Sequence, residues 1–251
     1  MRWVTGSTTN RRISRPGVRC ALAVSPALVP GVCLLLQLIP GTSSPLINVW
    51  LGFGLMMAPV ATWCGLLTKA QNHGPFLAAL GLVGALVAVV SVWQGIPCLA
   101  ALGQVVVASV LGLALARQFK RPWWLGLAAV GALVADLCSV FAGPTRLALE
   151  KAPAALSYLL MQAPALGGGE GMALGISDIL FLCLFLEGAR VCRLRVGWSM
   201  GAMLAGLMVT TGLAVAAGVA LPALPLLATG FLSANADLIV RDVRSGLRSP
   251  E

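Results

Sequence analysis

Residues 122–142 have the sequence Pro-Trp-Trp-Leu-Gly-Leu-Ala-Ala-Val-Gly-Ala-Leu-Val-Ala-Asp-Leu-Cys-Ser-Val-Phe-Ala, in which Asp136 is the single charged side chain. About 20 apolar residues suffice for a helix to cross a lipid bilayer. A carboxyl group at membrane depth is energetically unfavourable and is a functional-site hypothesis by default. The segment therefore predicts a transmembrane helix that carries one functional acid.

The rest of the chain has the same apolar character. Of its 251 residues, 59% are hydrophobic and 10% are charged, which no soluble domain of this size shows. We expect an all-α, polytopic transmembrane bundle, because the apolar runs are continuous and a β-barrel needs alternating segments of about ten residues. Eight spans are predicted, at approximately 18–40, 46–67, 75–94, 96–117, 122–142, 172–190, 197–219 and 222–240.

The basic residues predict the orientation. The net charge is +9, but these residues are confined to short loops and the two ends, so we do not expect nucleic-acid binding. With the N-terminus inside, fifteen of the 17 Lys and Arg residues lie on the inner side, and Arg146 and Lys151 lie on the outer side. This positive-inside bias predicts an even number of spans, with both termini in the cytoplasm.

Four regions follow from these spans. We expect a basic cytoplasmic N-terminus at 1–17, N-terminal transmembrane helices at 18–121, a second transmembrane half at 122–240 that carries the acids, and a cytoplasmic tail at 241–251.

The residues that most often bind metals do not cluster. The seven cysteines, at positions 20, 33, 64, 98, 138, 183 and 192, include no C-x-x-C pair. The single histidine, His73, lies in a predicted loop. We therefore predict no metal site and no cofactor.

A second acid and a proline motif are expected at the depth of Asp136. Asp178 lies in Ala-Leu-Gly-Ile-Ser-Asp-Ile-Leu-Phe (173–181), and Pro-Ala-Leu-Pro (222–225) opens the last span. At 1.5 Å per residue, Asp136 lies roughly 10 Å and Asp178 about 9 Å below the outer membrane face. The last span also starts at that face, and small residues beside both acids permit close helix contact. All three elements are therefore expected at one level of the membrane.

Two acids at one level are the minimal equipment of an aspartyl protease. Two carboxyl groups held close cannot both ionise easily, so the pair retains one proton. The ionised partner takes a proton from water, which attacks a peptide carbonyl, and the protonated partner polarises that carbonyl and donates to the leaving nitrogen. Because the proton belongs to the pair, we assign neither acid a fixed role.

The prolines predict an interrupted helix beside the acids. Proline has no N–H donor and disfavours helix in the residue before it. We therefore expect free backbone groups at 222–225 that help to hold an unwound substrate strand. Such irregular backbone is tolerated in a membrane where protein or a water cavity surrounds it.

The three motifs resemble those of the presenilin and signal peptide peptidase family, the GxGD-type intramembrane aspartyl proteases. The family's Tyr-Asp is present as Ala135-Asp136, its Gly-x-Gly-Asp as Gly175-Ile176-Ser177-Asp178, and its Pro-Ala-Leu-Pro unchanged at 222–225. The segments Gly143-Pro144, Arg146-Leu147 and Glu150, and also Asp178-Ile179-Leu180-Phe181, are similar to further family stretches. The resemblance covers roughly residues 120–240, the catalytic half.

The chain departs from the family pattern in three ways. Ala135 replaces tyrosine and Ser177 replaces the second motif glycine. Both replacements are small and sterically tolerable, but they can alter the rate or the cleavage preference. Four predicted spans precede the first acid, whereas the family has five there and nine in total.

The resemblance implies an intramembrane-cleaving aspartic endopeptidase without a cofactor. Asp136 and Asp178 would be catalytic, and the residues that support the active site would be Gly175, Ser177, Pro222, Ala223, Leu224 and Pro225. The implied partners are a transmembrane helical protein or a remnant signal peptide as substrate, and the lipid bilayer. A homo-oligomer is compatible with this reading, and obligate partner subunits are not indicated.

The resemblance also implies a location. The compact chain resembles prokaryotic relatives, which implies the prokaryotic cytoplasmic (inner) membrane. The predicted orientation, with the loop between the two acid spans outside, resembles signal peptide peptidase. It favours substrates whose N-terminal side lies in the cytoplasm.

Three alternatives stay open. Paired intramembrane acids and proline-broken helices also occur in proton-coupled transporters, although the halves show no convincing inverted repeat. Prepilin peptidases also use G-x-G-D, but they carry a lysine soon after the acid, where this chain has Ile179-Leu180-Phe181. A catalytically inactive presenilin-like helix-binding protein is the third alternative.

Other polar residues in the spans are expected to be structural. We expect Glu187 to pair with Arg190 at the inner interface and Asp237 to pair with Arg241, one helical turn on. Asn235 and Ser233 are predicted to form polar contacts between helices.

Overall fold

The computed structural model describes residues 25–68, 74–141, 158–168, 171–219 and 221–248. Within these residues the chain forms eight α-helices and one short β-hairpin. The helices are α2 (Leu28–Leu38), α3 (Pro45–Leu67), α4 (Gly74–Trp93), α5 (Pro97–Ala116), α6 (Pro122–Phe141), α9 (Ile176–Val191), α10 (Val196–Ala217) and α11 (Leu224–Arg248). The prediction of an all-α fold is confirmed, and each predicted span overlaps one of these helices.

Five of the helices, α3 to α6 and α10, are long and apolar enough to cross a membrane. Of the others, α2 has 11 residues, α9 has 16, and α11 has charged residues in its second half. These lengths and compositions support an integral membrane protein.

Two predicted boundaries are wrong. Residues 172–175, expected to begin a span, form strand β2 (Met172–Gly175), which pairs antiparallel with β1 (Leu160–Ala163). A short 3-10 turn, η2 (Leu166–Gly168), lies between the two strands. At the other boundary, α11 extends to Arg248, so the segment expected as a tail from residue 241 begins as helix.

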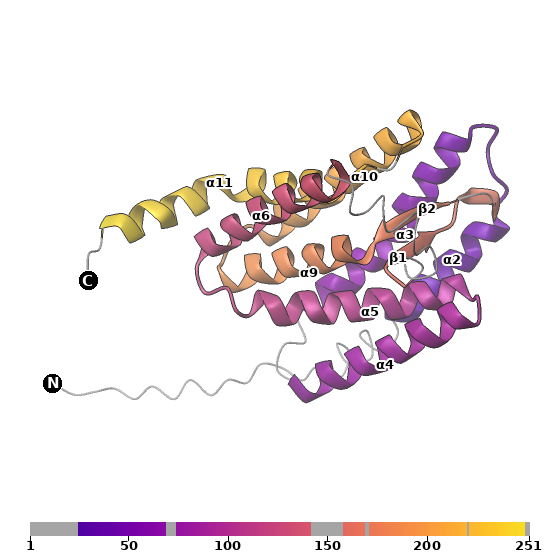
Figure 1. Cartoon of the computed structure of the whole chain (residues 1–251), viewed down its shortest axis with the longest axis horizontal. Coiled ribbons are helices and arrows are strands. Elements are labelled where there is room, and N and C mark those ends of the chain that lie inside the picture. Colours follow the sequence, from indigo (N-terminus) through magenta and orange to yellow (C-terminus); the bar gives the residue numbers. More distant parts are fainter. Residues whose placement is uncertain (1–24, 69–73, 142–157, 169–170, 220, 249–251) are drawn as a thin grey trace.

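The helices lie side by side along the long axis, and the hairpin occupies one end of the bundle (Figure 1). The opposite end holds the α5–α6 turn, the α9–α10 turn and the C-terminal end of α11. These three segments carry many of the basic residues that were predicted on the inner side: Arg117, Lys120, Arg121, Arg193, Arg195, Arg241 and Arg244.

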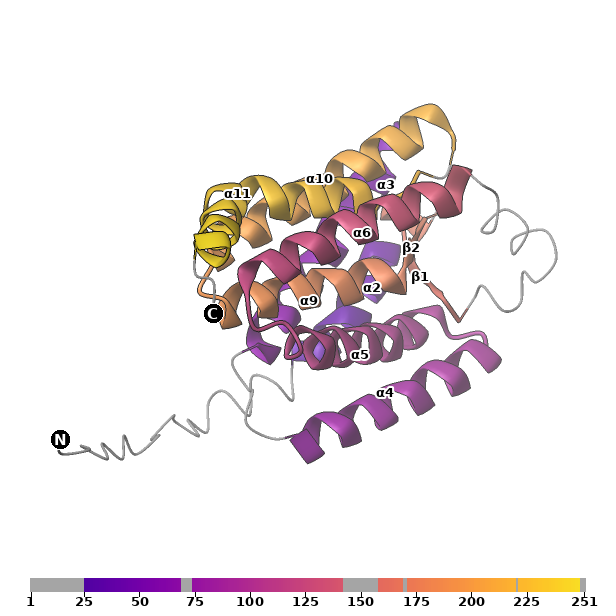
Figure 2. The same ribbon diagram turned by 60° about the vertical axis from the view of Figure 1, so that its left-hand side comes forward.

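Helix α9 is the centre of the bundle. It contacts α5, α6, α10, α11 and α3, and Figure 2 shows it between α5 and α6. Its residues 182–189 are all buried, as expected for a helix without a polar face. Glycine allows the closest approach: a Cβ on Gly112 of α5 would collide with the carbonyl oxygen of Leu180.

The other end of α5 makes two further connections near the hairpin. The turn from α4 to α5 is tight, as predicted, because Gly95 adopts a φ of 69° and ends α4. A disulfide joins Cys33 of α2 to Cys98 of α5. The sequence did not predict this bridge, because cysteine spacing alone does not give connectivity.

Polar contacts tie α10 to α11 at the basic end. Asp237 pairs with Arg195 at 2.8 Å, so the predicted partner, Arg241, was wrong. The buried side chain of Asn235 donates to the Ser199 hydroxyl at 2.7 Å and accepts from the backbone N–H of Arg195 at 3.0 Å. Asn235 therefore makes the predicted contact between helices, whereas Ser233 donates to the Gly230 carbonyl of its own helix.

Candidate active site

The first predicted acid contacts the proline motif. Helix α11 begins at Leu224, and Pro225 fits its first turn because proline lacks the N–H that would have no partner there. Leu224 retains its N–H, which donates to the Asp136 carboxylate at 3.1 Å. Asp136, from α6, therefore occupies one of the backbone donors that we expected to stay free for a substrate strand.

The second acid is positioned by the start of α9. Asp178 is the third residue of this helix, and Gly175 is its N-cap. The backbone N–H of Gly175 donates to the Asp178 carboxylate, which is the contact that an acid at this position makes in a capping box. Only 7% of Asp178 is exposed. Its carboxyl group is therefore fixed by the backbone at the end of strand β2.

The two acids lie near each other. Asp136 and Asp178 are close enough for their carboxyl groups to repel electrostatically. Asp136 is half-buried, whereas Asp178 is buried. The structure thus joins Asp136 to Leu224 by a hydrogen bond and places Asp178 within electrostatic range of Asp136.

The remaining site residues surround these three. A Cβ on Gly175 would lie 3.2 Å from Asp178 Oδ2 and 3.1 Å from Ser177 Oγ, so glycine leaves room for the acid. Ser177 and Ala135, the two positions that depart from the family motifs, are both exposed. Pro222, Ala223 and Pro225 are half-buried beside Leu224.

Some predicted features lie outside the described residues. These are His73, Lys151 and the segment with Gly143-Pro144, Arg146-Leu147 and Glu150. Among the residues that the structure does describe, no group of three or more His, Cys, Asp and Glu side chains could hold a metal ion.

The hairpin is the structural element beside the site that sequence reasoning missed. Strand β2 ends at Gly175, three residues before Asp178, and its one described partner strand is β1. Residues 172–176 carry no polar side chain, which favoured their assignment to a span. The Pro164 and glycines of the preceding segment were the available signal for a turn between two short strands.

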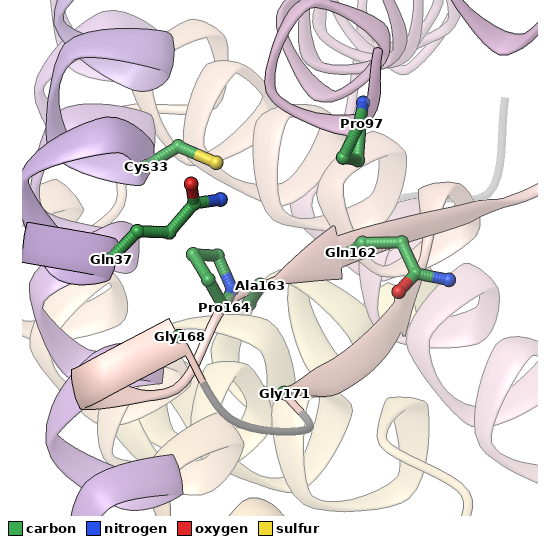
Figure 3. A pocket seen from close by; sticks show the side chains of 8 residues that line it. All are labelled: Cys33, Gln37, Pro97, Gln162, Ala163, Pro164, Gly168 and Gly171. Carbon is green, nitrogen blue, oxygen red and sulfur yellow. The ribbon is translucent and has the colours of Figure 1, made fainter. Parts of the chain in front are cut away.

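Two cavities flank the hairpin and not the acids. One, of about 220 Å³, is lined by Cys33, Gln37, Pro97, Gln162, Ala163, Pro164, Gly168 and Gly171 (Figure 3). The other, of about 280 Å³, lies between the α4–α5 turn and strand β1. Pro97 and Gln162 line both, so the two hollows are neighbours at this end of the bundle.

A second buried acid, Glu187, lies near the C-terminal end of α9. Glu187 is 0% exposed and interacts electrostatically with Arg190 and with Arg117 from the end of α5. Arg190 is the partner that the sequence predicted, and Arg117 is a second one that the sequence did not predict. The sequence also did not predict that the bundle encloses Glu187, because spacing on one helix does not show which helices cover it.

The chain matches no protein-family model, no curated protein and no solved structure. The function is therefore inferred from the residues and their geometry.

Proposed function

We propose that the chain is an intramembrane aspartyl protease of the presenilin-like type, which hydrolyses peptide bonds within transmembrane segments or remnant signal peptides. The observation that supports this proposal is the hydrogen bond between Leu224 and Asp136, together with the electrostatic effect of Asp136 on Asp178. Asp136 accepts the Leu224 N–H and lies within electrostatic reach of Asp178. Three motifs, far apart in the chain, thus supply the two carboxyl groups and a fixed donor beside them.

The chemistry requires one proton on the pair. Repulsion between neighbouring carboxylates favours a state in which one acid is protonated and the other ionised. The ionised acid takes a proton from a water molecule, whose oxygen forms a bond to the peptide carbon. The protonated acid polarises the carbonyl oxygen, and a proton then passes to the leaving nitrogen as the C–N bond breaks.

The hairpin supports a route for the substrate. An extended peptide can add to the edge of a sheet through backbone hydrogen bonds. Because β2 runs directly into the turn that holds Asp178, a strand added beside it would carry its carbonyl groups toward the acids. A helical substrate would have to unwind before it could pair there, since its backbone groups are otherwise bonded internally.

The proposed setting follows from the charges. Eight membrane spans would place both termini in the cytoplasm and the hairpin end toward the outer face of a prokaryotic inner membrane. This orientation favours substrates whose N-terminal side lies in the cytoplasm. We propose that the lipid bilayer and a single substrate helix are sufficient partners and that no cofactor is used.

The test is product identification in liposomes. Purified full-length protein is incubated with single-span reporter proteins, and the fragments are measured by mass spectrometry. We expect cleavage at bonds within the reporter span. Intact reporters across several span sequences would contradict the proposal and favour a presenilin-like helix-binding protein without activity.

Glu187 favours a second candidate, a proton-coupled transporter. A buried acid deeper on the helix that carries Asp178 extends the set of intramembrane acids, and such sets form proton relays. The discriminating measurement is proton flux into liposomes loaded with a pH-sensitive dye. Flux that depends on Asp136 and Asp178, without reporter cleavage, would establish the transporter.

A further inference from the structure

Two cysteines meet in the interior of the bundle, and one of them, Cys183, lies one helical turn before Glu187 on α9. Cys64 of α3 and Cys183 of α9 are free thiols, and their sulfur atoms are 2.6 Å apart. The Cys183 thiol donates to the Cys64 sulfur across this contact, and a covalent S–S bond is about 2.05 Å long. The two sulfur atoms therefore need to move little to form a bond.

Both sulfur atoms are shielded from water. Cys64 is 0% exposed and Cys183 is 1% exposed. The Ser109 hydroxyl of α5 lies 3.7 Å from the Cys64 sulfur. A charged, hydrophilic thiol such as glutathione cannot reach this position, whereas a small neutral oxidant can cross the surrounding lipid.

We propose that Cys64 and Cys183 are a modification site at which a membrane-permeant peroxide converts two thiols into a disulfide that ties α3 to α9. One sulfur attacks the peroxide, the O–O bond breaks, and a sulfenic acid and one water form. The second thiol then displaces the hydroxyl group as a second water. Two thiols lose two electrons and two protons, and hydrogen peroxide becomes two waters.

The rate and reversibility follow from burial. A thiol in apolar surroundings is a weaker nucleophile than an exposed one, so the first step is slower than oxidation of the exposed Cys138. The second step is fast, because the partner sulfur is already in contact. Once formed, the bond resists glutathione until the protein is unfolded.

The test uses the full-length chain with Cys20, Cys138 and Cys192 replaced by serine. The protein is treated with hydrogen peroxide, denatured without reductant and labelled with a maleimide. We expect Cys64 and Cys183 to label before peroxide and to be protected after it, with a mass decrease of two hydrogens. A hydrophobic phosphine added after denaturation should restore both labels and should also release the two thiols of the Cys33–Cys98 disulfide, so peptide mapping assigns each label.

Matched controls distinguish a disulfide from separate oxidation. In the same background, Cys64→Ala and Cys183→Ala should each retain one thiol that still labels or gains oxygen, without the loss of two hydrogens. If the triple serine variant does not fold, peptide mapping of the unmodified chain must find the peptide pair joined through Cys64 and Cys183. Continued labelling of both thiols, or oxygen added to each separately, would overturn the proposal.

Discussion

The backbone N–H of Leu224 donates to the carboxylate of Asp136 at 3.1 Å, across 88 residues of sequence. Leu224 is the first residue of α11 and the next residue, Pro225, has no N–H, so Leu224 offers the only backbone donor of these two positions. The Pro-Ala-Leu-Pro motif therefore does more than interrupt a helix. It orients the first acid of the proposed pair.

This hydrogen bond predicts different stabilities for two substitutions of Asp136. Asp136→Asn keeps an oxygen that can accept from Leu224, so the free energy of unfolding should stay close to that of the unmodified chain. Asp136→Ala leaves a buried N–H without a partner, which costs about 1–3 kcal/mol. Thermal unfolding in detergent measures both variants, and equal stabilities would show that the hydrogen bond does not position the acid.

Replacement of Gly175 should lower the proposed cleavage activity. In Gly175→Ala the added methyl lies 3.2 Å from Asp178 Oδ2, so the carboxyl group must shift. When a catalytic carboxyl group is moved out of its reactive position, the cleavage rate falls by roughly tenfold or more. Gly131→Ala is the matched control, because nothing lies within 4 Å of a Cβ at this position on α6. Similar cleavage rates for both variants would contradict the assigned role of Gly175.

Replacement of Gly112 should disturb the packing of α5 against α9. A methyl group in Gly112→Ala would collide with the Leu180 carbonyl oxygen and push α5 away from α9. Overpacking of this kind costs about 1–3 kcal/mol. Gly65→Ala, whose Cβ has nothing within 4 Å, should leave the unfolding temperature unchanged or slightly raised. Unfolding temperatures of the two variants check the central position of α9.

Removal of Glu187 and removal of Asp237, the two acids near the basic end of the bundle, should change the free energy of unfolding by different amounts. Removal of Glu187, which is 0% exposed, leaves Arg117 and Arg190 without their acid and destabilises the fold by about 3–5 kcal/mol in Glu187→Ala. Asp237→Asn breaks an ion pair whose side chains are 42% and 49% exposed, and it changes stability by about 0–1 kcal/mol. Chemical unfolding compares them, and a mild effect of Glu187→Ala would show that Glu187 is not part of a buried charge network.

The helices were predictable where hydrophobicity alone determines them. The expected ends of α3 to α6 and α10 agree with the structure to about two residues, because long apolar runs end at polar or proline-containing turns. The hairpin was not predictable in this way. Its strands have four residues each and are too short to show an alternating pattern against apolar neighbours.

The contacts of the site were not predictable from the sequence. The fixed rise of a helix predicted Asp136 and Asp178 at one level of the membrane, but it did not predict which side chains touch. Whether their side chains face each other depends on how each helix is rotated about its axis, and rotation is set by packing contacts such as Gly112 against Leu180. The Leu224 hydrogen bond and the Cys64–Cys183 contact depend on the same rotations and emerged only from the structure.

The most direct test compares reporter cleavage by the unmodified chain with cleavage by Asp136→Asn and Asp178→Asn in liposomes. Asp237→Asn serves as a control at an acid outside the site, and thermal unfolding confirms that each variant is folded. We predict that each site variant loses cleavage completely while the control retains it. Cleavage that persists in either folded site variant would contradict the assignment of Asp136 and Asp178 as the catalytic pair.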